Sequence, residues 1–292
     1  LLVAAFDHRD VFIDPSPDPA ASFKERERMF ALPRSSWQDY NKDLISKGGG
    51  VFPRSQKSIP LSPEIKALLD LEANEVSPFE LMQAILKARV ELLYFGGIGT
   101  YIKAPAQAHL DVGDKANDAI RIDGNEVRAK VIGEGANLGV TQAGRISCSE
   151  NGVRLNTDAI DNSAGVDCSD HEVNIKILLS QVIASGKLKP EARDDLLASM
   201  TDDVARHVLK HNYDQTLALS LQEATSAEDN SAQQAFMTGL EKRGRLDRKV
   251  EGLPGNSALE ARKAGGHGLY RPELAVITAY AKLVLFDDIV AG

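Results

Sequence analysis

The chain has 292 residues, of which 43% are hydrophobic and 26% are charged. These proportions are ordinary for a soluble globular protein, and the length predicts one large domain or two modest domains with ample core. The net charge of −8 argues against sequence-independent nucleic-acid binding, which depends on a basic surface that neutralises phosphates.

The amino terminus and the cysteine content bear on the compartment. The apolar start LLVAAF is interrupted by charged residues from Asp7 onward, so it is neither a signal peptide nor a transmembrane span. Cys148 and Cys168 are too few for a disulfide framework and fit a reducing cytoplasm. We therefore predict a cytoplasmic protein without a membrane partner. Because the chain opens without Met on a strand-like run, we also expect it to be a fragment of a longer protein.

The first elements include one candidate ligand residue. Residues 1–6 predict a short buried strand that ends at Asp7. In a dinucleotide-binding fold an acidic residue at the end of the second strand binds the adenosine ribose, although an Asp that merely caps a strand is more common. Residues 20–30 predict a helix, and residues 34–60 predict an irregular insertion. The run Gly48–Gly50 lacks the Gly-Lys-Ser/Thr ending of a P-loop, which favours a flexible turn over a phosphate site.

Two capping patterns predict the next helices. Ser62 and Ser77 are each followed by proline at the first helical position and by a glutamate in the first turn. A strand is expected at residues 91–94, ended by the sequence GGIGT at residues 96–100. This run is not the dinucleotide-binding fingerprint, so by itself it indicates only a close approach of the backbone to a ligand or to another segment.

The stretch from Val127 to Ile146 has the pattern of a buried strand that runs into a glycine-rich loop. Asn137 and Thr141 supply polar groups in that loop. A polar loop at the carboxyl end of a parallel strand is where open α/β sheets bind ligands. The residues alone leave a ligand loop and a plain connection to a helix equally open.

A second candidate loop follows. Residues 146–155 predict a strand or hairpin around the turn at Asn151-Gly152. A strong helix is then expected from Glu172 to Ser185. The entrance of this helix is crowded by Asn162, Gly165, Val166 and Ser169. Unpaired amides at a helix start attract carboxylates, so an anion or substrate site and ordinary capping remain equally open.

The rest of the chain is predicted to be helical. The helical segments are expected at residues 192–210, 213–224, 231–244 and 272–290. His207 and His211 lie one helical turn apart, but no Glu of an HExxH motif lies between them and no third ligand is evident. We therefore predict no metal site.

Several strings resemble a known family. EGAN at residues 134–137, followed by Thr141, and DNSAGVDCSDHE at residues 161–172 resemble the two signature loops in the nucleotide-binding half of glutamate dehydrogenases. Longer strings resemble the large bacterial NAD-dependent glutamate dehydrogenases in particular: AAFDHRDVFIDPSPDP, GGGVFPRSQKSIPLS and ELLYFGGIGTYIKA. The resemblance covers most of residues 1–185 and continues less distinctively to the end.

The resemblance implies a fold. It predicts an α/β protein with a Rossmann-like, doubly wound, mostly parallel sheet, whose first strand and glycine fingerprint would precede residue 1. A helical C-terminal region would follow this sheet. Residues 1–189 would belong to the NAD-binding domain and residues 190–292 to the helical region.

The resemblance also implies site residues. The cofactor NAD would be bound by Asp7, Gly96, Gly97, Thr100, Asn137 and Asn162. Asp7 would bind the adenosine ribose, Asn137 would lie beside the nicotinamide and its ribose, and Asn162 would contact the carboxamide. Val166 and Ser169 would contact the side-chain carboxylate of glutamate. The chain has NSAGV where the family has NAGGV, and GVT where the family has Pro-Thr-Thr after GAN, which leaves the loop geometry and the role of Thr141 open.

The function implied is NAD-dependent oxidative deamination of L-glutamate to 2-oxoglutarate and ammonia by an intact, homo-oligomeric enzyme. The family's catalytic lysine and aspartate have no match in this chain, so we expect the chain to be inactive alone. Two alternatives remain open. An amino-acid dehydrogenase of other specificity would prefer an apolar residue at the position of Ser169, and a non-catalytic regulatory or oligomerisation module would account for the helical half.

Overall fold

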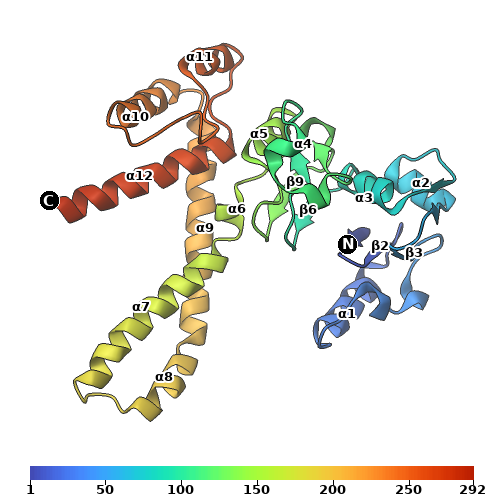
Figure 1. The fold of residues 1–292 in the computed structure, drawn as a ribbon, viewed down its shortest axis with the longest axis horizontal. Helices are drawn as coiled ribbons and strands as arrows, with labels where there is room; N and C mark the ends of the chain where they lie inside the picture. The colour runs from blue at the N-terminus through green and yellow to red at the C-terminus, as the bar shows by residue number, and fades with distance from the viewer. The chain divides into compact units, whose positions relative to one another are not determined.

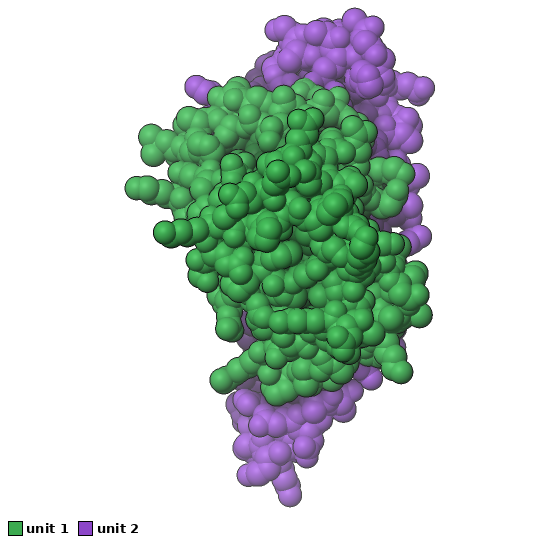
Figure 2. Space-filling model, turned by 90° about the vertical axis from the view of Figure 1, so that its right-hand side faces the viewer, with its two compact units in different colours: residues 1–132, 139–154 green, residues 133–138, 155–292 purple.

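The computed structural model describes all residues from 1 to 292 and shows a mixed α/β protein (Figure 1). The chain forms two compact units, coloured separately in Figure 2. Unit 1 comprises residues 1–132 and 139–154, and unit 2 comprises residues 133–138 and 155–292. No helix combines the length and the apolar character needed to cross a membrane.

The strands are short and belong to four small sheets rather than to one doubly wound sheet. They are β1 (Ala4–Phe6), β2 (Asp10–Ile13), β3 (Gly50–Pro53), β4 (Ile59–Pro60), β5 (Glu75–Val76), β6 (Leu92–Phe95), β7 (Ile102–Lys103), β8 (Ile122–Asp123) and β9 (Val131–Glu134). β1, β2 and β3 form an antiparallel sheet, β4 pairs antiparallel with β5, β7 pairs parallel with β8, and β6 pairs with β9. The predicted α/β class is confirmed at this coarser level.

Local capping explains where the helices of unit 1 begin. They are α1 (Pro19–Phe30), α2 (Pro63–Leu69), α3 (Pro78–Leu86), α4 (His109–Val112) and α5 (Gln142–Glu150). Ser62 and Ser77 cap α2 and α3 as predicted, because each hydroxyl accepts a hydrogen bond from a backbone amide three residues later and proline follows at the first helical position. Short 3₁₀ turns at Trp37–Asp39, Lys42–Leu44, Lys115–Asn117 and Gly124–Glu126 fill the connections.

The core of unit 1 is built from the interior faces of these elements. Its fully buried side chains include Ile13, Ile59, Ile65, Leu81 and Met82. A smaller cluster holds the insertion after α1 in place, because Phe12 stacks on Trp37 with ring centroids 4.8 Å apart. The insertion is therefore anchored by its aromatic residues and has no long helix, but the prediction that residues 34–60 are irregular is wrong in part, because they include β3, which pairs with β2, and β4, which pairs with β5.

Unit 2 is helical. Its helices are α6 (Asp158–Asp161), α7 (Ala164–Ala184), α8 (Arg193–Ser199), α9 (Thr201–Thr225), α10 (Asn230–Lys242), α11 (Asn256–Ala264) and α12 (Arg271–Ala291), with a 3₁₀ turn at Pro190–Ala192. Figure 1 shows α7 lying alongside α9, with α8 at the far end of the pair, and α12 also contacts α9. The apolar core gathers where α9, α10, α11 and α12 meet, around Leu219, Met237, Leu259 and Leu274. The predicted helical C-terminal region is confirmed.

Three other local predictions are wrong. Residues 146–155 form no strand or hairpin, because residues 142–150 belong to helix α5; after the turn at Asn151-Gly152, Arg154 makes only an isolated parallel bridge with Val131. The helix expected from Glu172 begins eight residues earlier, at Ala164. The two segments expected at 192–210 and 213–224 are divided differently, because α8 ends at Ser199 and α9 runs without a break from Thr201 to Thr225.

Candidate functional site

A candidate site lies within unit 2, where a cavity of ≈ 700 Å³ opens beside the start of α7. The residues that line it include Asn137, Asp158, Asn162, Val166, Asp167 and His211. The cavity therefore collects the glycine-rich loop after β9, the turn between α6 and α7, and one face of α9.

Two predicted cofactor residues meet at this cavity. The Nδ2 group of Asn162 donates a hydrogen bond of 2.8 Å to Oδ1 of Asn137, although the two residues are 25 positions apart in the sequence. This bond uses one donor of Asn162 and the acceptor of Asn137. The Nδ2 group of Asn137 and the Oδ1 atom of Asn162 are left as a neutral donor and acceptor pair, which is what recognition of an amide or a hydroxyl requires.

The loop that carries Asn137 is held by two carboxylates of α6. Asp158 accepts a hydrogen bond of 2.8 Å from the amide of Leu138, and Asp161 accepts one of 2.9 Å from the amide of Glu134. Leu138 has a positive φ of 63°, a conformation that costs a non-glycine residue about 1–2 kcal/mol. A strained backbone fixed at both ends by side chains is a common device for presenting a ligand-binding group.

Gly165 leaves room for the side chain of Asn162. A Cβ atom on Gly165 would lie 2.9 Å from Oδ1 and 3.1 Å from Nδ2 of Asn162. Real side chains do not approach this closely, so with any larger residue the amide of Asn162 would have to move, which would disturb its hydrogen bond to Asn137.

The predicted substrate residues lie on the first turns of α7. Val166 lines the cavity and is 62% exposed, whereas Ser169 is exposed but is not among the lining residues. Because α7 begins at Ala164, Ser169 lies inside the helix and not at its start. The argument that free helix-start amides near Ser169 attract a carboxylate is therefore wrong. Its substrate role rests on the resemblance alone.

The structure places Asp7 in a tight turn of unit 1. Its Oδ1 atom accepts hydrogen bonds from the amides of Arg9, at 2.7 Å, and Asp10, at 2.8 Å. The flanking strands β1 and β2 are antiparallel, so Asp7 does not lie at the carboxyl end of a parallel strand. This turn therefore lacks the parallel-strand geometry on which the expectation of a ribose-binding acid is based.

The three residues predicted after β6 have different surroundings. Gly97 has open space around it and Gly96 is near only the ring of Tyr94. Thr100 is buried: its amide donates a hydrogen bond of 2.8 Å to Asp114, and its carbonyl accepts one of 2.8 Å from Nε of Arg121. The backbone of Thr100 is thus fixed, while the two glycines are accessible.

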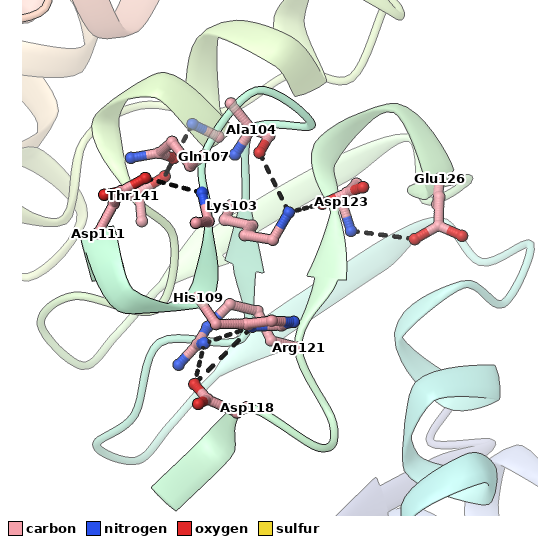
Figure 3. A network of polar contacts seen from close by, with 12 residues as sticks. Lys103, Ala104, Gln107, His109, Asp111, Asp118, Arg121, Asp123, Glu126 and Thr141 are labelled. Carbon is pink, nitrogen blue, oxygen red and sulfur yellow. Dashed lines mark hydrogen bonds and ion pairs between the residues drawn. The ribbon is translucent and has the colours of Figure 1, made fainter. Parts of the chain in front are cut away.

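Local electrostatics keep the carboxylate of Asp114, which holds the amide of Thr100, charged. Burial acts to raise the pKa of Asp114, but hydrogen bonds from Asn117 and from the amide of Thr100, together with the charge of Arg121, outweigh it and hold the pKa below its usual value. Figure 3 shows Arg121 reaching Asp118 and His109 as well, and its side chain is fully buried. A buried guanidinium needs such a set of acceptors.

Thr141 has a structural role in the same part of unit 1. Its Oγ1 atom accepts a hydrogen bond of 2.9 Å from the amide of Gly144 and donates one of 2.7 Å to Gln107, as Figure 3 shows for the second contact. Thr141 is therefore the N-cap of α5. The nearby ion pair between Lys103 and Asp123 joins β7 to β8 across their parallel register (Figure 3).

Sequence reasoning missed Asp158, Asp161 and the side of α9 that carries His211. The two aspartates carry a weak signal, since they lie on a short helix directly before the NSAGV string. The sequence marks His211 only by its spacing from His207 and does not place it at the cavity, because only the packing of α7 against α9 brings it there.

Comparison with known proteins shows which family this chain matches. The family described as "Bacterial NAD-glutamate dehydrogenase, catalytic domain" matches residues 1–222. Three relatives are named NAD-specific glutamate dehydrogenase: the chain is 51% identical to the one from Halomonas elongata over 291 residues, 53% to the one from Pseudomonas aeruginosa over 288, and 50% to the one from Mycobacterium tuberculosis over 296. These matches cover 99% or 100% of this chain but only 18% of each relative, so the chain spans about a fifth of the length of the relatives it matches.

Proposed function

Because the chain belongs to the family of bacterial NAD-glutamate dehydrogenase catalytic domains, we propose that it supplies part of the nicotinamide and substrate site of an NAD-dependent glutamate dehydrogenase. The intact enzyme would convert L-glutamate, NAD and water to 2-oxoglutarate, ammonia and reduced NAD. The protein that carries this chain would act in the cytoplasm as a homo-oligomer.

The observation that carries the proposal is the hydrogen bond between Asn137 and Asn162 beside a cavity. Each asparagine lies in one of the two strings that resemble the signature loops of glutamate dehydrogenases, and the fold joins those strings at one place. Two loops that meet through functional side chains support a shared role in holding one ligand.

The chemistry explains why amides suit this position. Hydride transfer from the α-carbon of glutamate requires the donor carbon and the nicotinamide ring to be held in near-attack geometry. NAD supplies the hydride acceptor, and the protein supplies position and environment. Asn137 and Asn162 can fix a carboxamide and a ribose hydroxyl without adding charge beside the ring, which becomes neutral when it accepts the hydride. Water then hydrolyses the imino acid to 2-oxoglutarate and ammonia.

The remaining site residues are part of the same proposal. We assign Asp7, Gly96, Gly97 and Thr100 to NAD binding, on the resemblance and not on their present geometry. Val166 would contact the substrate carboxylate together with Ser169. Of these two, only Val166 has support from the cavity.

The domain assignment is likewise a proposal. Residues 1–189 would contribute to a Rossmann-like, doubly wound NAD-binding domain that other parts of the polypeptide complete, and residues 190–292 would form a helical region beside it. The catalytic lysine and aspartate would come from elsewhere in the intact protein, so this chain alone would not oxidise glutamate.

Steady-state kinetics of the intact protein test the proposal. The variants Asn137→Ala and Asn162→Ala are compared with wild type for glutamate-dependent reduction of NAD. Losing one hydrogen bond to the cofactor and the bond between the asparagines removes about 1–3 kcal/mol, so kcat/KM for NAD should fall about 5- to 150-fold.

Asn174→Ala is the matched control. Asn174 is an exposed asparagine on α7 whose side chain donates only to the carbonyl one turn earlier, so its kinetics should match wild type. Wild-type kcat/KM in both cavity variants would refute the assignment of the site. Absence of any glutamate- and NAD-dependent activity in the wild-type protein would refute the proposed function itself.

A further inference from the structure

A cluster of metal-binding side chains lies between α7 and α9, apart from the asparagine pair. Asp167 and His171 are one turn apart on α7, and His207 and His211 are one turn apart on α9. Figure 1 shows these helices side by side, and their packing brings both pairs together. The neighbouring helix α7 thus supplies candidate third ligands for the histidine pair of α9, which spacing along the sequence did not reveal.

Three of the four side chains already converge. Nδ1 of His211 lies 3.0 Å from one carboxylate oxygen of Asp167, and Nδ1 of His171 lies 3.2 Å from the other. One potential ligand atom from each of the three residues can be chosen so that all lie within 4.8 Å of one another. His207 stacks near the cluster, with its ring centroid 6.0 Å from that of His171, but is not among these three.

The distances suit a small divalent ion. Zinc binds imidazole nitrogen and carboxylate oxygen at about 2.0–2.2 Å, which places tetrahedral ligand atoms about 3.3 Å from one another. The two shorter contacts in the cluster already have this spacing. The third pair lies within 4.8 Å, so reaching this spacing takes a side-chain shift of up to about 1.5 Å, in which Nδ1 of His171 would also leave the carbonyl of Asp167, 2.9 Å away. Partial exposure allows such a shift, since the side chain of His171 is 26% exposed and that of His211 is 46% exposed.

The cluster shares two residues with the cavity. Asp167 and His211 belong both to the lining of the cavity and to the cluster, whereas His171 belongs only to the cluster. Three protein ligands next to an open cavity leave a fourth coordination position free, which is the arrangement of reactive rather than purely structural zinc sites.

We propose that Asp167, His171 and His211 bind one divalent transition-metal ion of the zinc type, with an open coordination position on the side of the cavity. Imidazole and carboxylate ligands favour zinc and its chemical analogues over magnesium and calcium, which prefer oxygen ligands alone. This inference does not depend on the proposed dehydrogenase activity.

Metal titration tests the proposal on the intact polypeptide that carries this chain, prepared without a polyhistidine tag. Calorimetric titration with Zn²⁺ measures stoichiometry and affinity, and Co²⁺ absorption reports four-coordinate binding because tetrahedral cobalt absorbs far more strongly than octahedral cobalt. Wild type should bind one ion per chain. His171→Gln and His211→Gln should each lose the ion or bind it at least about 10-fold more weakly, since loss of an outer-shell partner alone costs about 10- to 100-fold. The intense cobalt bands should disappear in both variants.

Two histidine controls sharpen the result. His267→Gln removes an exposed histidine away from the cluster, and His207→Gln removes the neighbour that is not one of the three ligands. Both should retain the wild-type affinity. Binding that is equal in wild type, His171→Gln and His211→Gln would overturn the proposal, as would an equal loss in His207→Gln or His267→Gln. Circular dichroism must match wild type in every variant, and Asp167→Asn provides a second test that leaves both histidines in place.

Discussion

Gly165 offers the sharpest test of how the cavity is built. In Gly165→Ala the new Cβ would lie 2.9 Å from Oδ1 and 3.3 Å from Cγ of Asn162, so that amide must move by several tenths of an ångström. Its 2.8 Å hydrogen bond to Asn137 would then lengthen or break. Gly165 is the second residue of α7 and has no positive φ, so the backbone itself accepts alanine.

The magnitude follows from two opposing effects. Alanine in place of glycine favours a helix by up to about 1 kcal/mol, and loss of the bond between the asparagines costs about 0.5–1.5 kcal/mol. The two nearly cancel, so the stability of α7 should change by less than about 1 kcal/mol. Binding of NAD should weaken, because the displaced amide no longer presents its acceptor, and the loss of one hydrogen bond corresponds to a fall of about 2- to 13-fold in affinity.

Two measurements on the intact protein separate these effects. Titration of reduced NAD by fluorescence gives affinity, and hydrogen exchange of the α7 amides gives local stability. Gly239→Ala in α10 is the control, because a Cβ there meets nothing within 4 Å and should only strengthen its helix. Wild-type affinity in Gly165→Ala would refute the argument that glycine is needed there to leave room for Asn162.

Two further predictions concern unit 1. Thr141→Ala should weaken α5 by about 1–2 kcal/mol because the amide of Gly144 loses its cap, and Thr141→Ser should restore most of it; hydrogen exchange of α5 checks both. The pKa of Asp114 in the folded state is lowered, because the hydrogen bonds from Asn117 and Thr100 outweigh burial. Its carboxylate therefore stabilises the fold at neutral pH. This stability is lost as the pH falls below about 4, the ordinary pKa of an aspartate, and passes the lowered pKa of the folded state. Asp114→Asn keeps an acceptor and removes the titration, so the difference in thermal midpoint between wild type and Asp114→Asn should shrink or reverse between about pH 6 and pH 3; a constant difference would contradict this.

Signals carried by a few adjacent residues predicted structure well. Ser62 and Ser77 each combine an N-cap, a proline and an acid in one turn, and both helices begin where that pattern places them. The error at residues 146–155 has a local cause too. The turn at Asn151-Gly152 favoured a strand or hairpin, but the cap at Thr141 and the buried side of α5 at Cys148 make the residues before that turn helical.

Contacts between distant residues could not be predicted from spacing. The pattern marked Asn137 and Asn162 as candidates, their roles came from the family resemblance, and nothing in either string says that the two side chains touch. His211 and Asp167 are 44 residues apart, and their contact depends on α7 starting early enough to lie along α9. An expected helix start at residue 172 would have left Asp167 outside the helix altogether.

The early start of α7 connects the two proposals. One turn of this helix presents Val166 to the cavity, and Asp167, the next residue, both lines the cavity and contacts His211. A ligand in the cavity and an ion in the cluster would therefore act on the same carboxylate. Linkage is reciprocal, so whatever factor the ion imposes on ligand affinity the ligand must impose on ion affinity. The titration of Zn²⁺ should therefore shift when reduced NAD is present, and Asn137→Ala should need a higher concentration of reduced NAD for the same shift.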